Sequence, residues 1–554
     1  MAGFSASGDD GLTRRDVLAG AGAAAAALLA AGLGVRYIAN RPDATPTPTP
    51  VGPAGPFALG VASGDPLPDS VILWTRLAED GRGTLPQGLF YGGGPGTEVQ
   101  WQVSRDEAFT QLVASGSQRA ESSTGYSIHA DVRGLQPGGE YFYRFRVFGD
   151  ISPVGRTRTL PPPRADVSSL RFAFSSCQNY ADGYYPSHRA LAEEDLAFVA
   201  WLGDYIYETE SEATSARLHS PTEAGSGLLR TLQDYRDRYA QYHSDLELQA
   251  AHAAHPWVVT WDDHEVRDNY AGAFPGPAGD YYEQVVERPE DVLLAETQFL
   301  ELRARAYQAW WENIPTRAAA PTDGGELRIY RDFDVGTLMR VCVLDGRQYR
   351  EHPAAEGRVA GLPQAGETNV DGSMTGQAQE EWLLERLASS PGLWNVIAQP
   401  VVMMPVHIGP VVNLDQWDGF GPQRERLLRA LREFSNPVVL SGDVHTTWMN
   451  VLSYDAETDA SVAATKVASE LVAPSTSSEP PFGYVAAVTA SNLVTNPGMR
   501  YFQGENRGYM RCEVTRDALR ATPVFAESVA SPDEPVGDGP TFVITAGDPE
   551  IRPA

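Results

Sequence analysis

An unbroken apolar run from Leu196 to Leu202 constrains the fold more than any other stretch of this sequence. The run has the length of a β-strand and ends at Gly203, and the polar side chains of Asp204 and Tyr207 follow at once. A strand that is apolar on both faces is typical of the centre of a sheet covered by helices. Because ligands of such sheets bind beyond the carboxyl ends of the strands, we expect Asp204 and Tyr207 at a functional site. The alternative is a strand-end turn with a solvated aspartate.

Three other apolar runs, 170–176, 257–261 and 438–441, end in the same way. The side chains that follow them are a thiol, carboxylates, imidazoles and an amide: Cys177 after the first run, Asp263, His264 and Asn269 after the second, and Asp443 and His445 after the third. Since neighbouring strands bring their ends together, we expect all of these groups at one edge of one sheet.

This set of side chains has the chemistry of a metal site. Thiolate, phenolate, carboxylate and imidazole together suit a hard, highly charged cation such as Fe(III), and the thiolate adds soft character. Carboxylate and amide oxygens suit Ca²⁺ or Mn²⁺. Two neighbouring cations clamp a phosphate and lower the pKa of a bound water. The alternative is structural, with His264 capping a helix and Cys177 acting as a small buried apolar residue.

The chain of 554 residues is longer than one hydrophobic core usually holds, so we expect two domains. Short strands separated by Gly and Pro predict an all-β sandwich of the fibronectin type III kind over 57–163, with a tyrosine corner at Tyr141. From 168 to 525, strands alternate with amphipathic helices, which predicts a layered α/β domain. The predicted helices are 187–194, 234–254, 297–312, 377–388 and 424–434. Residues 526–554 are expected to form an acidic, structureless tail.

The composition and the N-terminus bear on partners and location. A formal net charge of −29 argues against binding to nucleic acid or to an anionic membrane. Residues 1–40 carry the Arg14-Arg15 pair and an Ala-rich run, which predicts a twin-arginine signal, partnership with the twin-arginine translocase and a secreted or cell-envelope location. A retained anchor is the alternative. Residues 41–56 predict an extended Pro/Thr-rich tether. Among the three cysteines, Cys342 and Cys512 are expected to be buried thiols, with a bridge between them as the alternative.

The strand-end motifs resemble those of the metallophosphoesterase superfamily. Gly203-Asp204, Asp262-Asp263-His264-Glu265 and Gly442-Asp443-Val444-His445 are similar to its second, third and last blocks, and Tyr207 is similar to the iron-binding Tyr of purple acid phosphatases. Ser176-Cys177-Gln178-Asn179 departs from the usual first block and resembles the PhoD-like alkaline phosphatases. Segments 60–66, 344–350 and 417–420 resemble that branch as well, so the likeness spans about 57–524.

The resemblance implies a layered β-sandwich core flanked by helices, a Fe(III)–Ca²⁺ centre, and attack on phosphate by a metal-bound hydroxide or oxide. Cys177, Asp204, Tyr207 and His445 would hold Fe(III). Asp204, Asp443 and either Asp263 or Asn269 would hold Ca²⁺. His264 would be a proton donor. Arg347 and Arg350 would contact phosphate, or alternatively pair with structural carboxylates.

The leading hypothesis is therefore an exported, calcium-dependent phosphoesterase with an alkaline optimum, acting on small phosphate monoesters and on diesters. One alternative keeps the metal site and changes the substrate, giving a phospholipase D that acts on phospholipids. Another is an inactive surface-binding protein that uses the sandwich for adhesion.

Overall fold

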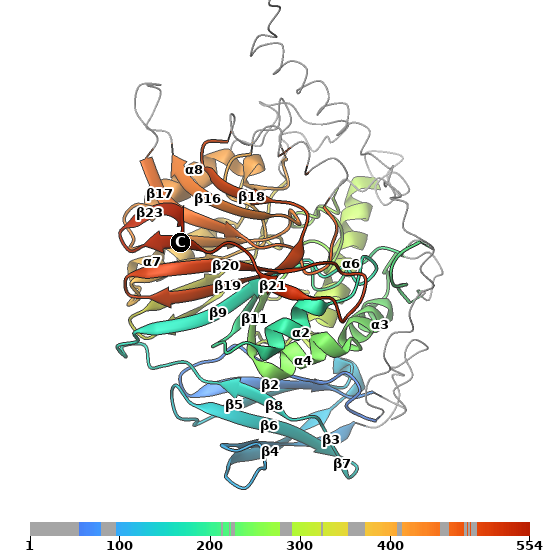
Figure 1. Cartoon of the computed structure of the whole chain (residues 1–554). Coiled ribbons are helices and arrows are strands. Elements are labelled where there is room, and N and C mark those ends of the chain that lie inside the picture. The colour runs from blue at the N-terminus through green and yellow to red at the C-terminus, as the bar shows by residue number, and fades with distance from the viewer. Residues whose placement is uncertain are drawn as a thin grey trace, which may run out of the picture.

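The computed structural model describes residues 55–78, 96–211, 214–220, 222, 228–276, 291–322, 325–352, 372–406, 413–454, 465–480, 485, 488 and 496–554. The predicted signal at 1–40, most of the predicted tether and much of the long insertions lie outside these residues. Two large sheets pack face to face, and helices cover their outer sides (Figure 1).

The larger sheet has eleven strands, and β21 (Val536–Asp538) joins it beside β20. Its other strands lie in the order β23 (Asp548–Pro553), β22 (Phe542–Thr545), β20 (Ala518–Ala526), β19 (Arg507–Thr515), β9 (Ser169–Ser175), β10 (Val199–Leu202), β11 (Pro256–Thr260), β1 (Val61–Gly64), β2 (Ser70–Arg76) and β5 (Ser127–Arg133).

The second sheet has seven strands. They lie in the order β12 (Arg331–Val335), β13 (Met339–Val343), β14 (Trp394–Ala398), β15 (Pro437–Ser441), β17 (Thr465–Val472), β16 (Thr447–Tyr454) and β18 (Met499–Gln503).

The apolar run at the centre of the sequence forms β10, whose residues are all buried. It pairs in parallel with β9 on one side and β11 on the other, which confirms the predicted central strand. The expectation that all four ligand-bearing strands share one sheet is wrong, because β15 belongs to the second sheet. Side chains such as Phe174 and Leu440 form a common core between the two sheets, so their strand ends meet at one end of the sandwich.

Helices cover both outer faces of the sandwich. The face of the larger sheet packs against α2 (Pro186–Glu193), α3 (Leu232–His243), α4 (Leu246–Ala254) and α6 (Asp291–Asn313). The face of the second sheet packs against α7 (Gln377–Ala388) and α8 (Gly421–Leu431).

The single helix predicted over 234–254 is in fact two helices, α3 and α4. Asp245 lies between them in an extended conformation and caps α4 by accepting hydrogen bonds from Glu247 and Leu248. An N-cap residue has a non-helical backbone, so the helix is interrupted at Asp245. The apolar pattern of the sequence continues through this interruption and therefore does not predict it.

The N-terminal region is rich in strands. It contains the third sheet of the structure, which has five strands: β4 (Leu112–Ala120), β3 (Thr97–Ser104), β6 (Glu140–Val147), β7 (Asp150–Ile151) and β8 (Gly155–Arg158). This sheet packs on β1, β2 and β5, and the Tyr141 hydroxyl accepts a 2.8 Å hydrogen bond from the Gln136 amide, as the predicted tyrosine corner requires. The assignment to the fibronectin type III kind stays a prediction.

The N-terminal strands do more than pack beside the second region, because β1 pairs in parallel with β11 and so extends its sheet. Gly64 ends β1 where a Cβ atom would lie 2.0 Å from the carbonyl oxygen of Pro315. The next residue, Asp65, is buried and pairs with Arg331 at 2.6 Å. The 60–66 motif therefore joins the two regions.

The predicted structureless tail is wrong, because the last residues form β21, β22 and β23. Phe542, Ile544 and Ile551 are buried in the core between the two sheets. The apolar residues of these strands alternate over only a few positions and are separated by Gly, Asp and Pro. In an acidic segment, such short alternations do not predict strands.

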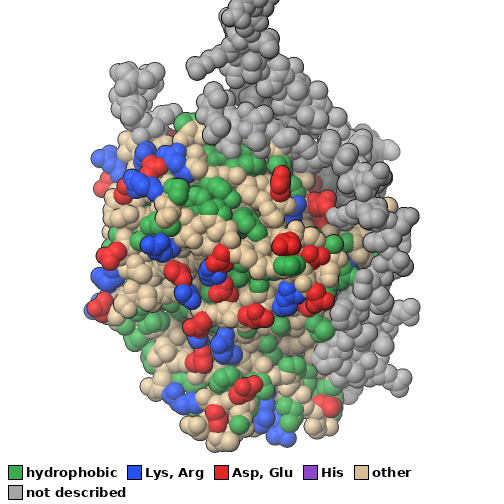
Figure 2. Space-filling model, in the orientation of Figure 1, with side chains coloured by type: hydrophobic (Ala, Val, Ile, Leu, Met, Phe, Trp, Pro, Cys, Tyr) green, Lys and Arg blue, Asp and Glu red, His purple; other side chains and the backbone are tan. Residues whose placement is uncertain are grey.

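All three cysteines are buried and free, so Cys342 and Cys512 are thiols as predicted and form no bridge. Within the described residues, none of the helices has the length and apolarity needed to cross a membrane. Figure 2 shows acidic and basic side chains interspersed over the visible face.

Candidate metal centre

The strand ends turn sharply where the candidate ligands begin. Gly203 has a φ of 106°, and a Cβ atom there would lie 2.5 Å from the Cβ of Asp262. Cys177, Asp204 and Asp443 have positive φ values of 58°, 55° and 66°. Each such residue costs of order 1–3 kcal/mol and persists only when its surroundings hold it in place. Strain at these positions is what a site with fixed side-chain directions requires.

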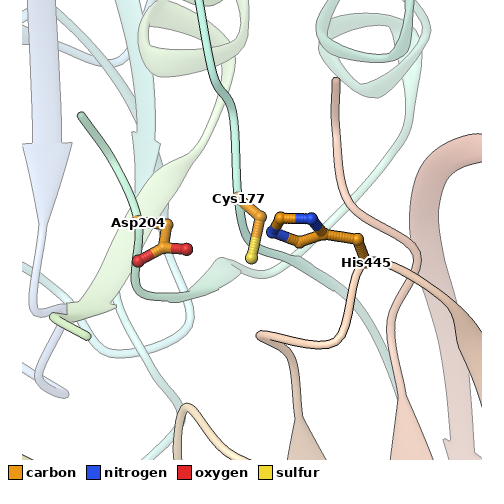
Figure 3. Close-up of side chains that lie close together, drawn as sticks. All are labelled: Cys177, Asp204 and His445. Carbon is orange, nitrogen blue, oxygen red and sulfur yellow. The ribbon is translucent and has the colours of Figure 1, made fainter. Parts of the chain in front are cut away.

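Cys177, Asp204 and His445 form the first group of candidate ligands, and one ligand atom from each lies within 4.8 Å of the others. They come from the ends of β9, β10 and β15 and point toward one another (Figure 3). Tyr207 joins this group, because its hydroxyl lies 2.9 Å from Asp204 Oδ2 and 3.1 Å from His445 Nε2. The structure thus brings together the thiol, carboxyl, phenol and imidazole that the sequence placed on separate strands.

Two further groups share residues with the first. Asp204 lies with Asp263 and His264, and Asp263 lies with Asp262 and Asp443, each group within the same 4.8 Å limit. Asp204 and Asp263 therefore connect the cysteine end of the cluster to a carboxylate-rich end. This geometry fits two neighbouring cations with a shared carboxylate.

Neighbouring groups fix the candidate ligands. The Asn269 amide N–H donates to Asp263 Oδ2 at 2.6 Å, whereas the Asn269 side chain donates to Asp268 at 3.2 Å. The Gln416 side-chain amide donates to Asp443 Oδ2. The Ser478 hydroxyl lies 2.8 Å from the Tyr207 hydroxyl. Each of these contacts restricts which oxygen of a ligand faces the cluster.

Glu265 ties the ends of β10 and β11 together. Its carboxylate accepts the backbone N–H groups of Asp204 at 3.1 Å, Tyr205 at 2.7 Å and Asp262 at 2.9 Å. These bonds satisfy the backbone of two tight turns at once, which is how two separate strand ends acquire a common geometry.

The electrostatics of the cluster favour bound cations. Burial and nearby carboxylates, foremost Asp204, raise the pKa of the Cys177 thiol. Burial, with Asp415 and Asp263 beside it, raises the pKa of Asp443 to about 7. Burial lowers the pKa of His445 to about 3, so its imidazole is neutral and able to act as a ligand. Acids with raised pKa values keep their protons near neutral pH, and they release these protons when a cation binds to the deprotonated groups.

Two orphaned carboxylate oxygens support the same conclusion. Asp204 Oδ1 and Asp262 Oδ2 are buried and have no hydrogen-bond partner among the residues that the structure describes. Unpaired buried carboxylate oxygens are costly, and a cation is the partner that the surrounding acids would accept. The residues present therefore fit a site for hard cations with one thiolate ligand.

His264 lies beside the cluster, partly exposed. Its Nδ1 is 2.7 Å from Glu208 Oε2, and its ring stacks on Tyr207 with centroids 4.2 Å apart. Burial opposes the charged imidazole, but Glu208, Asp263 and Asp204 raise its pKa well above the usual value. The other oxygen of Glu208 accepts the Asp268 N–H at 2.9 Å, which fixes both carboxylate oxygens.

Arg347 is fully buried, so its side chain is not exposed to solvent. Its guanidinium pairs with Asp262 at 2.5 Å and with Asp415 at 2.6 Å, and it lies 3.7 Å from Asp263. Arg350 also pairs with Asp415, at 2.8 Å. The structure thus has both arginines paired with carboxylates, which was the alternative to direct phosphate contact.

Sequence reasoning missed several residues at this site. Glu208 directly follows Tyr207, so adjacency to a predicted ligand was its signal, whereas Asp262 was named only as part of the Asp262-Asp263-His264-Glu265 motif and was given no role of its own. Gln416 adjoins the 417–420 motif. Ser478 follows no motif, and only the folded chain brings it to Tyr207.

Comparison with known proteins assigns this chain to a family. Residues 172–522 match the PhoD-like phosphatase family, and residues 44–161 match the N-terminal domain of PhoD-like phosphatases. The chain belongs to the PhoD-like phosphatase family. Alkaline phosphatase D of Bacillus subtilis (strain 168) is 40% identical over 497 residues, which cover 88% of this chain and 80% of that protein.

A solved structure described as the structure of PhoD has a TM-score of 0.78 and 38% identity to this chain, covering 90% of this chain and 92% of that one. The mixed sheets and helices and the strand-rich N-terminal region are therefore those of a PhoD-like phosphatase. The chain is a homologue of alkaline phosphatase D over most of its length.

Proposed function

We propose that this chain is an exported phosphoesterase that hydrolyses phosphate monoesters, and diesters as well, at a Fe(III)–Ca²⁺ centre. The observation that carries the proposal is the convergence of Cys177, Asp204 and His445, with Tyr207 beside them, next to a second cluster of carboxylates. Membership of the PhoD-like phosphatases supports the same activity.

Cys177, Asp204, Tyr207 and His445 would hold the iron, because thiolate, carboxylate, phenolate and imidazole together favour Fe(III). Asp204, Asp263 and Asp443 would hold calcium, which prefers oxygen ligands. When bound, the cations polarise the phosphate and lower the pKa of a bound water.

Of Asp263 and Asn269, the two candidates for the calcium ligand, we favour Asp263. Asp263 lies in two of the ligand groups, whereas the Asn269 side chain is turned to Asp268. The backbone N–H of Asn269 supports Asp263 from outside the cluster. Asn269 would thus orient the ligand.

His264 would give a proton to the leaving-group oxygen. Glu208 binds Nδ1 and leaves Nε2 as the ring atom able to donate toward the substrate. Stacking on Tyr207 restricts rotation of the ring. A positioned acid of this kind contributes about 10²–10⁴-fold to the rate.

Arg347 would act as a positioning residue for the carboxylates. It neutralises Asp262 and Asp415 and lies close to Asp263, so these acids can share a small volume before cations bind. Burial opposes ionisation of Asp263, but Arg347 and His264 lower its pKa below the usual value.

Export through the twin-arginine translocase rests on Arg14-Arg15 and the Ala-rich run that follows. N-terminal sequencing of protein recovered outside the cytoplasm would test it. A cleaved N-terminus beyond the run supports export with processing, and an intact one at the membrane indicates a retained anchor.

The choice of substrate is tested by product release from an aryl monoester, an aryl diester and phosphatidylcholine, each with added Ca²⁺ and after chelation. The candidate ligands at the centre are carboxylates, imidazoles, a phenol and a thiol, which fit the charged phosphate group of each of these substrates. We expect calcium-dependent turnover of the monoester to exceed the others. Preference for the lipid would move the function to phospholipase D.

A further inference from the structure

A surface pocket of about 220 Å³ lies outside the metal-ligand cluster, between α6 and the segment that leads into α3. It is lined by Leu228, Leu229, Arg230, Arg267, Gln298, Glu301, Leu302 and Arg305. At about 30 Å³ per water molecule, it has room for about seven waters. This space is enough for a phosphate group and part of the moiety attached to it.

The charge of this pocket is opposite to that of the chain. The whole sequence has 43 basic and 72 acidic residues, but the described residues that line the pocket carry three guanidinium groups and one carboxylate. Arg305 is held by Glu301 at 3.2 Å and by the Arg230 carbonyl at 3.3 Å. In the part of the chain that the structure describes, the exposed Arg230 guanidinium has no hydrogen-bond or ion-pair partner.

Two walls of the pocket connect directly to the candidate metal centre. Arg267 is 7% exposed, and its backbone N–H donates to the Asp263 carbonyl at 2.7 Å. The Leu229 N–H donates to the carbonyl of Glu208, the residue that binds His264, at 3.3 Å. The pocket therefore lies behind the turn that carries Asp263 and His264.

We propose that this pocket binds a phosphate group. Guanidinium forks match phosphate oxygens in geometry and charge, and Leu228, Leu229 and Leu302 provide an apolar wall for the attached moiety. The phosphate has two sources of the same chemistry: free inorganic phosphate, or a second phosphate of the substrate being hydrolysed. The second source rests on the proposed function.

The test is equilibrium dialysis of the metal-loaded enzyme against radiolabelled inorganic phosphate in 0.15 M KCl, which screens diffuse attraction. The double variant Arg230→Gln/Arg305→Gln is expected to bind one phosphate fewer per chain than the wild type. Glu301→Gln removes the one acid among the described lining residues and should tighten this binding about three- to tenfold. Arg520→Gln, which removes one positive charge at an exposed position on β20 outside the pocket, should leave it unchanged.

The difference of one phosphate between wild type and double variant decides the proposal, whatever the metal centre binds. If the centre takes phosphate, we expect two against one, and if the proposed function fails, one against none. Equal binding by both proteins overturns the proposal. So does loss of a phosphate in Arg520→Gln as well, since that would reflect net charge alone.

A kinetic arm separates the two sources. The KM for a bisphosphate ester relative to a monophosphate ester should rise about three- to tenfold in the double variant if the pocket takes a second substrate phosphate. An unchanged ratio, with one phosphate lost in dialysis, assigns the pocket to free phosphate.

Discussion

Glu208→Gln tests the proton-donor role of His264 most sharply. The variant keeps the shape of the side chain but replaces the ionised partner of His264 Nδ1, 2.7 Å away, by a neutral amide. Hydrogen bonds with an ionised partner are worth about 1.5–3 kcal/mol, and neutral ones about half of that. The loss of about 0.8–1.5 kcal/mol corresponds to a roughly four- to thirteenfold lower kcat.

The size of the loss should depend on the leaving group. An alkyl alkoxide needs a proton from His264, whereas a nitrophenolate leaves without one. We therefore expect the full loss with an alkyl phosphate and a loss of less than about threefold with a nitrophenyl phosphate. Steady-state kinetics on both esters, with wild type and variant at equal metal content, measure this difference.

Glu312→Gln is the matched control. Glu312 is also buried and also holds a basic side chain, with Arg236 2.6 Å away, but Arg236, unlike His264, belongs to none of the ligand groups found in the described part of the chain. Its replacement should lower stability without any dependence on the leaving group. An equal loss with both esters in Glu208→Gln would refute the role of His264 as an oriented acid.

Three further predictions concern the metal ligands and the buried core. Tyr207→Phe should abolish a visible phenolate-to-iron absorption band while the fold is kept, and Cys177→Ser should lose iron; a colourless, fully active wild type would sink the iron assignment. Gln416→Leu removes the donor to Asp443 Oδ2 and should weaken calcium binding about tenfold, measured as the Ca²⁺ dependence of activity, with unchanged iron content; calcium affinity equal to that of the wild type would contradict the orienting role. Burial lowers the pKa of His188 to about 4, so the folded state resists protonation and stability that is present above about pH 6.5 is lost as the pH falls toward 4. Urea unfolding of chelated protein should show this loss, at most about 1.4 kcal/mol per pH unit, and His188→Gln should reduce it; an unchanged slope would exclude His188 as its source.

The strands that carry the ligands were predictable because each is a continuous apolar run with an abrupt polar end. The run at β10 is buried on both faces, and that pattern predicts a central strand, which the structure places between β9 and β11. The residues directly after each run were thus placed correctly near one another. The apolar pattern predicts both the strand and the residue at which it ends, and the polar residues just beyond that end predict the metal site.

Sheet membership was not predictable in the same way. An apolar run has no feature that selects which of two sheets it joins, and β15 joined the second. The break at Asp245 depends on a capping bond and on the buried ion pair with Arg217, two contacts that form only in the folded chain. The C-terminal strands were missed because their apolar alternations are only a few residues long.

The roles of the polar side chains were predictable only in part. Arg347 occurs in a motif next to predicted ligands, but the sequence does not state whether its partner is a phosphate or a carboxylate. In the folded chain its partners are Asp262 and Asp415. Gln416 and Ser478 reach the site through long-range packing, which no local pattern encodes.

The most direct test of the Fe(III)–Ca²⁺ centre is element analysis of the purified, active enzyme by mass spectrometry, with activity followed as metal is removed. We expect one iron per chain and at least one calcium, with activity lost on chelation and restored by Ca²⁺. Full activity in protein that holds zinc, or no iron, would contradict this expectation.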